Sequence, residues 1–90
     1  MAIPNQQKAL FLLHHAGPYS VETTPVHTLE PGEVLVRVDA TDLNPSDWKT
    51  RFTEYSAVLQ GYPAVQGHDV AGTVVQVSQG VTEFAVGDRV

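Results

Sequence analysis

The sequence contains no cysteine among its 90 residues. Disulfide bonds are therefore excluded, and so are the thiolate ligands that hold most structural zinc ions. A basic cluster is also missing, since ten acidic residues against five basic ones leave a formal charge of −5. Nucleic acids attract proteins through gathered Lys and Arg side chains, so this balance argues against a nucleic-acid partner.

Long hydrophobic runs are lacking as well. The apolar run near the N-terminus covers only residues 9–13 and is followed by two histidines. A helix needs about 20 apolar residues to span a bilayer, and histidines do not fit the small-residue cleavage site of a signal peptide. We therefore expect a soluble, cytoplasmic protein with no membrane partner.

What is present is typical of one small globular domain, with 42% hydrophobic and 17% charged residues. A chain this short buries only roughly 60% of its unfolded surface, so modest stability is expected. The last residues stop inside an apolar segment that resembles the start of a strand. We therefore expect residues 1–90 to be the N-terminal portion of a longer protein.

Several segments have the composition of strands. Residues 7–14 form an apolar run that ends in the turn residues Ala16-Gly17-Pro18, and residues 19–26 predict an edge strand because Pro25 interrupts them. Pro31-Gly32 predicts a type II turn. The alternation in residues 33–41 predicts a strand whose apolar face carries Val34, Val36, Val38 and Ala40.

Two more strands are predicted towards the C-terminus. Residues 70–81 form one, with Val75 and Val77 on one face and a turn at Gly80. Residues 86–90 begin another after a turn at Val86-Gly87-Asp88. There are no repeats or linkers. The fold class is therefore expected to be mainly β, in a small and strongly bent barrel.

One short helix interrupts the strands. Asn44 suits the N-cap, Pro45 suits the first helical position, and Asp47 stands three residues after the cap, as in a capping box. Residues 52–67 show no sustained period and predict a long surface loop with one helical turn. Loops of that length often carry function.

Gly67-His68-Asp69 could indicate a metal site, but its potential partners are poor. A catalytic zinc needs three protein ligands, and His14 and His15 point to opposite faces if both lie on a strand. His27 has no obvious partner. A hydrolytic set of Ser46, His68 and Asp69 is not favoured either, because the strained turn that presents a catalytic serine is missing.

Two longer segments are more specific. Residues 31–49 (PGEVLVRVDATDLNPSDWK) and residues 61–90, above all the run from Gly67 to Val90, match a spaced pattern of glycines, valines and a final Gly-Asp-x-Val. In these features the chain resembles the GroES-like N-terminal catalytic domain of the medium-chain dehydrogenase/reductase superfamily. The resemblance covers residues 7–90 and implies a GroES-like barrel.

The resemblance also bears on the metal. Zinc alcohol dehydrogenases of this superfamily carry a cysteine where Asn44 stands, and their Gly-His-Glu segment is matched by His68 and Asp69. An amide oxygen is a poor zinc ligand compared with a thiolate. The resemblance therefore implies no bound metal, with His68 kept as a pocket residue.

Within the zinc-independent branch, the segment NPSDWK is similar to quinone oxidoreductases and to fungal stand-alone trans-enoyl reductases, including their toxin-biosynthesis relatives. The resemblance implies that this segment lies against the nicotinamide end of NADPH and that Lys49 acts in catalysis. The implied cofactor-binding residues are Asn44, Ser46, Asp47, Trp48 and Lys49. From the residues alone, Asp47 is better explained as a helix cap than as a contact to an anionic cofactor.

The implied reaction is reduction of an α,β-unsaturated acyl thioester. The implied partners are that thioester, free or bound to a carrier protein, and a polyketide synthase. The glycine-rich dinucleotide fingerprint is absent from these 90 residues, as expected if the nucleotide-binding domain follows them. Two alternatives remain open at this point: a zinc-dependent alcohol dehydrogenase of the same superfamily, and a GroES-like fragment without activity.

Overall fold

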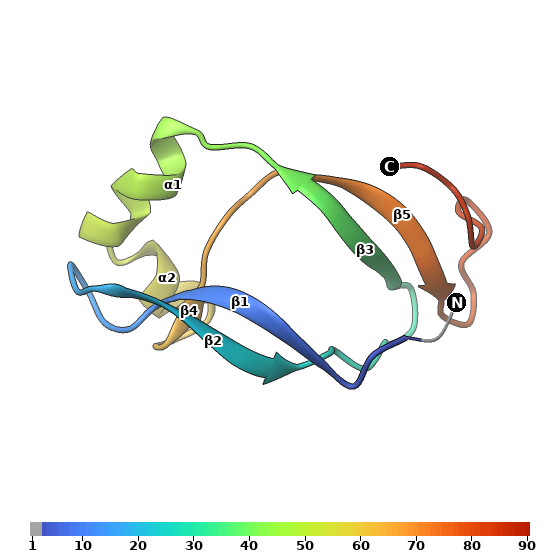
Figure 1. Ribbon diagram of the computed structural model, residues 1–90, viewed down its shortest axis with the longest axis horizontal. Helices are drawn as coiled ribbons and strands as arrows, with labels where there is room; N and C mark the ends of the chain where they lie inside the picture. The colour runs from blue at the N-terminus through green and yellow to red at the C-terminus, as the bar shows by residue number, and fades with distance from the viewer. Residues whose placement is uncertain (1–2) are drawn as a thin grey trace. The chain divides into compact units, whose positions relative to one another are not determined.

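The computed structural model describes residues 3–90 (Figure 1). Strands dominate it, so the expected mainly β class is confirmed. The chain divides into two compact units. Unit 1 contains residues 26–41 and 69–90 together with the segment before residue 6, and unit 2 contains residues 6–25 and 42–68.

Unit 2 is built on a three-stranded sheet in the order β2-β1-β4. β1 (Gln6–Leu12) pairs antiparallel with β2 (Tyr19–Pro25) along its whole length, and its C-terminal end pairs with β4 (Ala64–Val65). β2 is an edge strand, as Pro25 predicts. Leu12 is 0% exposed at the point where β1 meets both neighbours, so it forms the core of this sheet.

The turn between β1 and β2 corrects one expectation. β1 ends at Leu12, so His14 and His15 lie in the turn and not on opposite faces of a strand. Ala16 takes a φ of 55° there, and the main-chain N–H of Gly17 donates to the carbonyl of His14 at 2.8 Å. The strand stops early because this tight turn already begins at His14.

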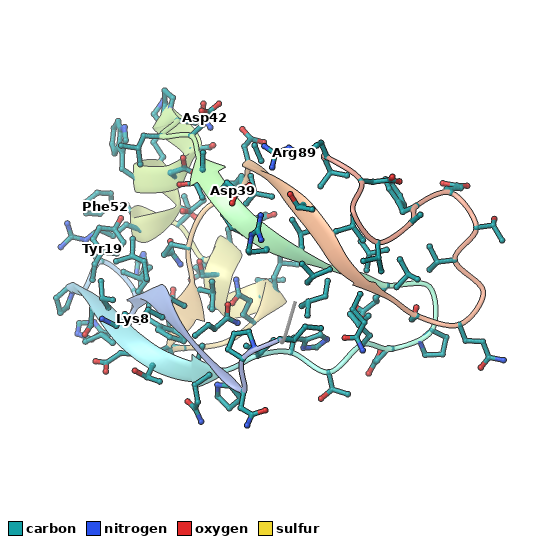
Figure 2. The ribbon with its side chains drawn as sticks, turned by 45° about the vertical axis from the view of Figure 1, so that its right-hand side comes forward. Lys8, Tyr19, Asp39, Asp42, Phe52 and Arg89 are labelled. Atoms are coloured by element: carbon teal, nitrogen blue, oxygen red, sulfur yellow. The ribbon has the colours of Figure 1, made fainter. Side chains whose placement is uncertain are left out.

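Arg51 attaches this hairpin to the helical part of unit 2. Its Nε donates to the carbonyl oxygen of Gly17 at 2.7 Å. Its guanidinium carbon lies 5.3 Å from the ring centres of both Tyr19 and Phe52, which Figure 2 labels on neighbouring segments. A cation close to two aromatic rings is favourable, and the main-chain N–H of Ala16 also donates to the carbonyl of Arg51 at 2.8 Å, so the side chain and the backbone of Arg51 both hold the hairpin against the helices.

Unit 1 contains the antiparallel pair β3 (Val34–Thr41) and β5 (Val70–Val77). The turn before β3 has the predicted form: Gly32 has a φ of 86°, and the N–H of Glu33 donates to the carbonyl of Glu30 at 3.1 Å. The sequence offered no partner for His27, but Nε2 of His27 lies 3.3 Å from Oε1 of Glu33, so the structure provides one.

The expected apolar face of β3 is only partly formed. The β3–β5 register shifts twice, so that Asp39 on β3 and Val75 on β5 have no opposite residue. Val38 is 51% exposed although it falls on the predicted apolar face, and the buried valine of β5 is Val74 rather than Val75.

Residues 88–90 pair with β5 only through an isolated bridge, so the predicted third strand over residues 86–90 is not formed as a full strand. Gly72 and Val90 exchange main-chain hydrogen bonds of 2.9 and 3.0 Å, and Arg89 forms a bridge with Thr73. Figure 2 shows the Arg89 and Asp39 side chains near each other, and Arg89 donates to Asp39 at 2.7 Å. This charged bond helps to hold the last residues on the sheet.

The helical part of unit 2 has more turns than the single helix predicted. It comprises α1 (Pro45–Lys49), the 3-10 turn η1 (Thr50–Phe52) and α2 (Tyr55–Leu59), which lies within the predicted loop. β4 also lies in that segment and was not predicted. Within residues 3–90, none of the helices has the length and apolar composition needed to cross a bilayer.

Candidate functional site

The candidate site lies in unit 2, where α1 begins. Asn44 is the N-cap and forms a capping box with Asp47. The main-chain N–H of Asn44 donates to Oδ2 of Asp47 at 2.6 Å, which satisfies a donor that the helix itself leaves unpaired. The local prediction for this helix is therefore confirmed, including Pro45 at its first position.

The second oxygen of Asp47 reaches a residue far away in the sequence. Oδ1 of Asp47 lies 2.5 Å from Nδ1 of His68, with 14% of the Asp47 side chain and 34% of the His68 side chain exposed. The hydrogen bond to His68 lowers the pKa of the Asp47 carboxyl, and the bond from Asn44 lowers it further. Asp47 therefore joins the helix cap to the histidine as a carboxylate.

A small hollow of about 120 Å³ lies beside this pair. The rings of His68 and Tyr55 are 6.2 Å apart and tilted by 51°. The hollow has polar groups on one part of its wall and apolar side chains on another. Its lining residues are Thr50, Tyr55, Ser56, Leu59, Gln60, Val65, Gln66, Gly67 and His68.

Side-chain amides shape the floor of this hollow. The amide of Gln60 bonds both the N–H and the carbonyl oxygen of Val65, each at 3.0 Å. The amide N of Gln66 donates to the carbonyl of Ala64 at 3.0 Å. These bonds fix the backbone of β4, which leads directly into the loop that carries His68. The position of the histidine therefore depends on an ordered segment of backbone.

The other predicted site residues lie on α1. Ser46, Trp48 and Lys49 are exposed, and Nζ of Lys49 lies 5.6 Å from the Trp48 ring centre. The structure therefore brings Asn44, Asp47 and His68 together through hydrogen bonds, while Lys49 is held against its own neighbour by a cation–π contact.

Sequence reasoning missed two features of this site. It did not pair Asp47 with His68, and it did not place Tyr55 at the hollow. The only available signal was the capping-box position of Asp47, which explains one carboxylate oxygen and leaves the other without a role. Within residues 3–90, no three His, Cys, Asp or Glu side chains are arranged to hold a metal ion.

Comparison with known proteins places the chain in a family. Residues 30–90 match the family described as alcohol dehydrogenase GroES-like domain. The chain belongs to this family. Relatives carry names that include trans-enoyl reductase, quinone oxidoreductase and alcohol dehydrogenase, so the resemblance found in the sequence is confirmed.

Two curated relatives illustrate the range of this family. The zinc-binding alcohol dehydrogenase domain-containing protein cipB of Emericella nidulans is 40% identical over 83% of this chain and 23% of its own length. The trans-enoyl reductase himH of Aspergillus japonicus is 45% identical over 64% of this chain and 16% of its own length. The chain thus spans about a quarter or less of these relatives.

A solved structure agrees with the fold. An alcohol dehydrogenase superfamily protein from Novosphingobium aromaticivorans is similar with a TM-score of 0.78 and 38% sequence identity. The similarity covers 91% of this chain and 25% of that one. The GroES-like β fold expected from the sequence is therefore confirmed.

Proposed function

We propose that the full-length protein is a zinc-independent, NADPH-dependent enoyl reductase, and that this chain forms one wall of its active site. The reaction proposed is hydride transfer to the β-carbon of an α,β-unsaturated acyl thioester. Relatives named trans-enoyl reductase support the reaction class. The observation that carries the proposal is the Asp47–His68 bond, which joins the NPSDWK helix to the hollow beside Tyr55.

The residues of α1 fit the nicotinamide end of such a cofactor in character. Trp48 offers an exposed apolar ring surface, and Lys49 offers an ammonium group that can meet a ribose hydroxyl, a phosphate or a developing enolate oxygen. Both oxygens of Asp47 are already engaged, by Asn44 and His68. The Asp47 carboxylate therefore already has partners within the protein and need not face an anionic cofactor.

The donor set supports the absence of zinc in this proposal. Asn44 offers an amide where related zinc enzymes have a thiolate, and an amide oxygen is a poor zinc ligand by comparison. The proposed substrate is an acyl thioester, free or bound to a carrier protein. The proposed partner is a polyketide synthase that supplies it, as the resemblance of the NPSDWK segment to fungal stand-alone trans-enoyl reductases implies.

A Lys49→Ala variant of the full-length protein tests this proposal. We expect turnover or NADPH affinity to fall by at least about tenfold, because a charge that meets the cofactor or the enolate contributes on that scale. The assay follows NADPH oxidation with a short enoyl thioester. Lys8→Ala, which removes another exposed lysine of unit 2, is the matched control. Unchanged kinetics for Lys49→Ala would remove Lys49 from the site.

A zinc-dependent alcohol dehydrogenase is the second candidate. It is favoured by the name of the 40% identical relative cipB, a zinc-binding alcohol dehydrogenase domain-containing protein, and by the presence of His68 at the position of a zinc ligand. Metal analysis of the full-length protein separates the two candidates. Stoichiometric zinc, lost together with activity after chelation, would replace the enoyl reductase proposal with this one.

A further inference from the structure

We propose that His68 transfers the proton in this site and that Asp47 is the residue that positions it. The inference rests on the proposed function for its substrate, because the hollow beside His68 is where an enoyl group would lie. It assigns roles that go beyond the predicted pocket position of His68. It also explains why Asp47 uses its two oxygens on two different partners.

The geometry around Asp47 leaves the carboxylate little freedom. Oδ2 accepts the main-chain N–H of Asn44 at 2.6 Å, and Oδ1 lies 2.5 Å from Nδ1 of His68. Asp47 itself stands in the first turn of α1, so its backbone is fixed by the helix. A carboxylate anchored at both oxygens sets the direction of the imidazole ring that it contacts.

This contact also decides which nitrogen of His68 carries hydrogen. An ionised carboxylate can only accept hydrogen bonds, so Nδ1 must donate. The neutral ring therefore carries its hydrogen at Nδ1, and the lone pair is at Nε2. Nε2 is therefore the nitrogen through which the ring can take up and return a proton, as in other carboxylate–histidine pairs.

The lining and the size of the hollow suit an unsaturated acyl group beside His68. His68 and Tyr55 lie on its wall with their rings 6.2 Å apart, and Leu59 and Val65 supply apolar surface for an acyl chain. A volume of about 120 Å³ suits the short unsaturated end of a thioester rather than a complete long chain.

The chemical step balances with the groups named. A bound NADPH would supply the chemistry of hydride transfer to the β-carbon, which would leave the α-carbon and the thioester carbonyl as an enolate. Nε2 of His68 then gives its proton to the α-carbon, and the neutral imidazole keeps its hydrogen at Nδ1 toward Asp47. A proton from water restores Nε2–H for the next cycle.

Nitrogen NMR of the full-length protein tests the positioning part without any activity. The ¹⁵N shifts of the His68 ring, assigned with a His68→Gln variant, report which ring nitrogen carries hydrogen. Neutral His68 is expected as the Nδ1–H form. Finding the Nε2–H form in the unmodified chain would overturn the inference.

Asp47→Asn sharpens the test because it is nearly isosteric. The single amide oxygen can still accept from Asn44, which turns the amide N–H₂ group toward Nδ1 of His68. We expect His68 to change to the Nε2–H form in a folded chain. Asp88→Asn is the control, since Asp88 accepts the N–H of Ala85 in a turn of unit 1. An unchanged His68 in Asp47→Asn would contradict the positioning role.

Activity measurements in the full-length protein test the proton transfer. His68→Gln should lower enoyl turnover by about a hundredfold or more, and Asp47→Asn by at least about tenfold, with NADPH binding retained. If the unmodified protein reduces enoyl thioesters and His68→Gln reduces them equally fast, this inference fails and the proposed function stands. If the unmodified protein does not reduce them, the proposed function fails, and the NMR result still decides whether Asp47 positions His68.

Discussion

Replacing Gly72 by alanine should strongly destabilise unit 1. Gly72 lies in the middle of β5, opposite Val38 on one side and bonded to Val90 on the other. A Cβ atom at this position would lie 2.1 Å from the carbonyl oxygen of Arg37 and 2.9 Å from Cγ1 of Val36. The first obstacle is backbone, so a side-chain rotation cannot remove it.

The size of the effect follows from this contact. Ordinary van der Waals contact for a Cβ atom begins at 3.4 Å, whereas this Cβ would lie 2.1 Å from the Arg37 oxygen. β3 and β5 would therefore have to move apart locally by about 1.3 Å. Overpacking of this kind costs about 1–3 kcal/mol, and each hydrogen bond that is lost adds about 1 kcal/mol. The lower entropy of unfolded alanine offsets only about 0.4–1 kcal/mol.

We therefore expect a loss of about 2 kcal/mol or more in the free energy of unfolding. For a domain of this size, that corresponds to a decrease of roughly 10 °C or more in Tm. Circular dichroism during heating and in urea measures both. Gly17→Ala is the matched control, because its Cβ would meet only the ring of the exposed His14, at 2.5 Å, and that side chain can move. Equal stability of the two variants would refute the reasoning.

Two further changes test the core and the charges. Leu12→Ala should lower the free energy of unfolding by about 2–5 kcal/mol, since Leu12 is 0% exposed, whereas Val21→Ala on the exposed edge strand β2 should change it little in the same urea titration. Acid should also destabilise the chain, because the hydrogen bond from Arg89 lowers the pKa of Asp39 in the folded state. The contribution of Asp39 to the free energy of unfolding is therefore complete above the unfolded pKa of about 3.9, and it is lost as the pH falls through the lower folded pKa. Urea midpoints between about pH 6 and about pH 2 should fall less steeply for Asp39→Asn, and parallel curves would contradict this assignment.

The features that the sequence predicted best are those decided by neighbouring residues. The turn at Pro31-Gly32 has the expected positive φ at glycine, and the helix begins at Pro45 after the Asn44 cap. Pro25 placed β2 at a sheet edge because proline cannot donate to a further strand. The family was also within reach, since spaced motifs over most of the chain carried the resemblance.

The features that the sequence did not predict depend on residues far apart. The two-residue strand β4 is too short to show a period, and it exists because its backbone pairs with β1. The alternation in β3 correctly predicted a strand. It did not predict the two register shifts, because those depend on how β5 pairs with β3.

The candidate site divides in the same way. The helix cap formed by Asn44 and Asp47 could be predicted from local sequence, since a capping box needs only a spacing of three residues. The contact between the second oxygen of Asp47 and His68, 21 residues later and beside Tyr55, depends on how the chain folds. No local rule links these side chains; they meet because pairing of β1 and β4 returns the loop to the start of α1.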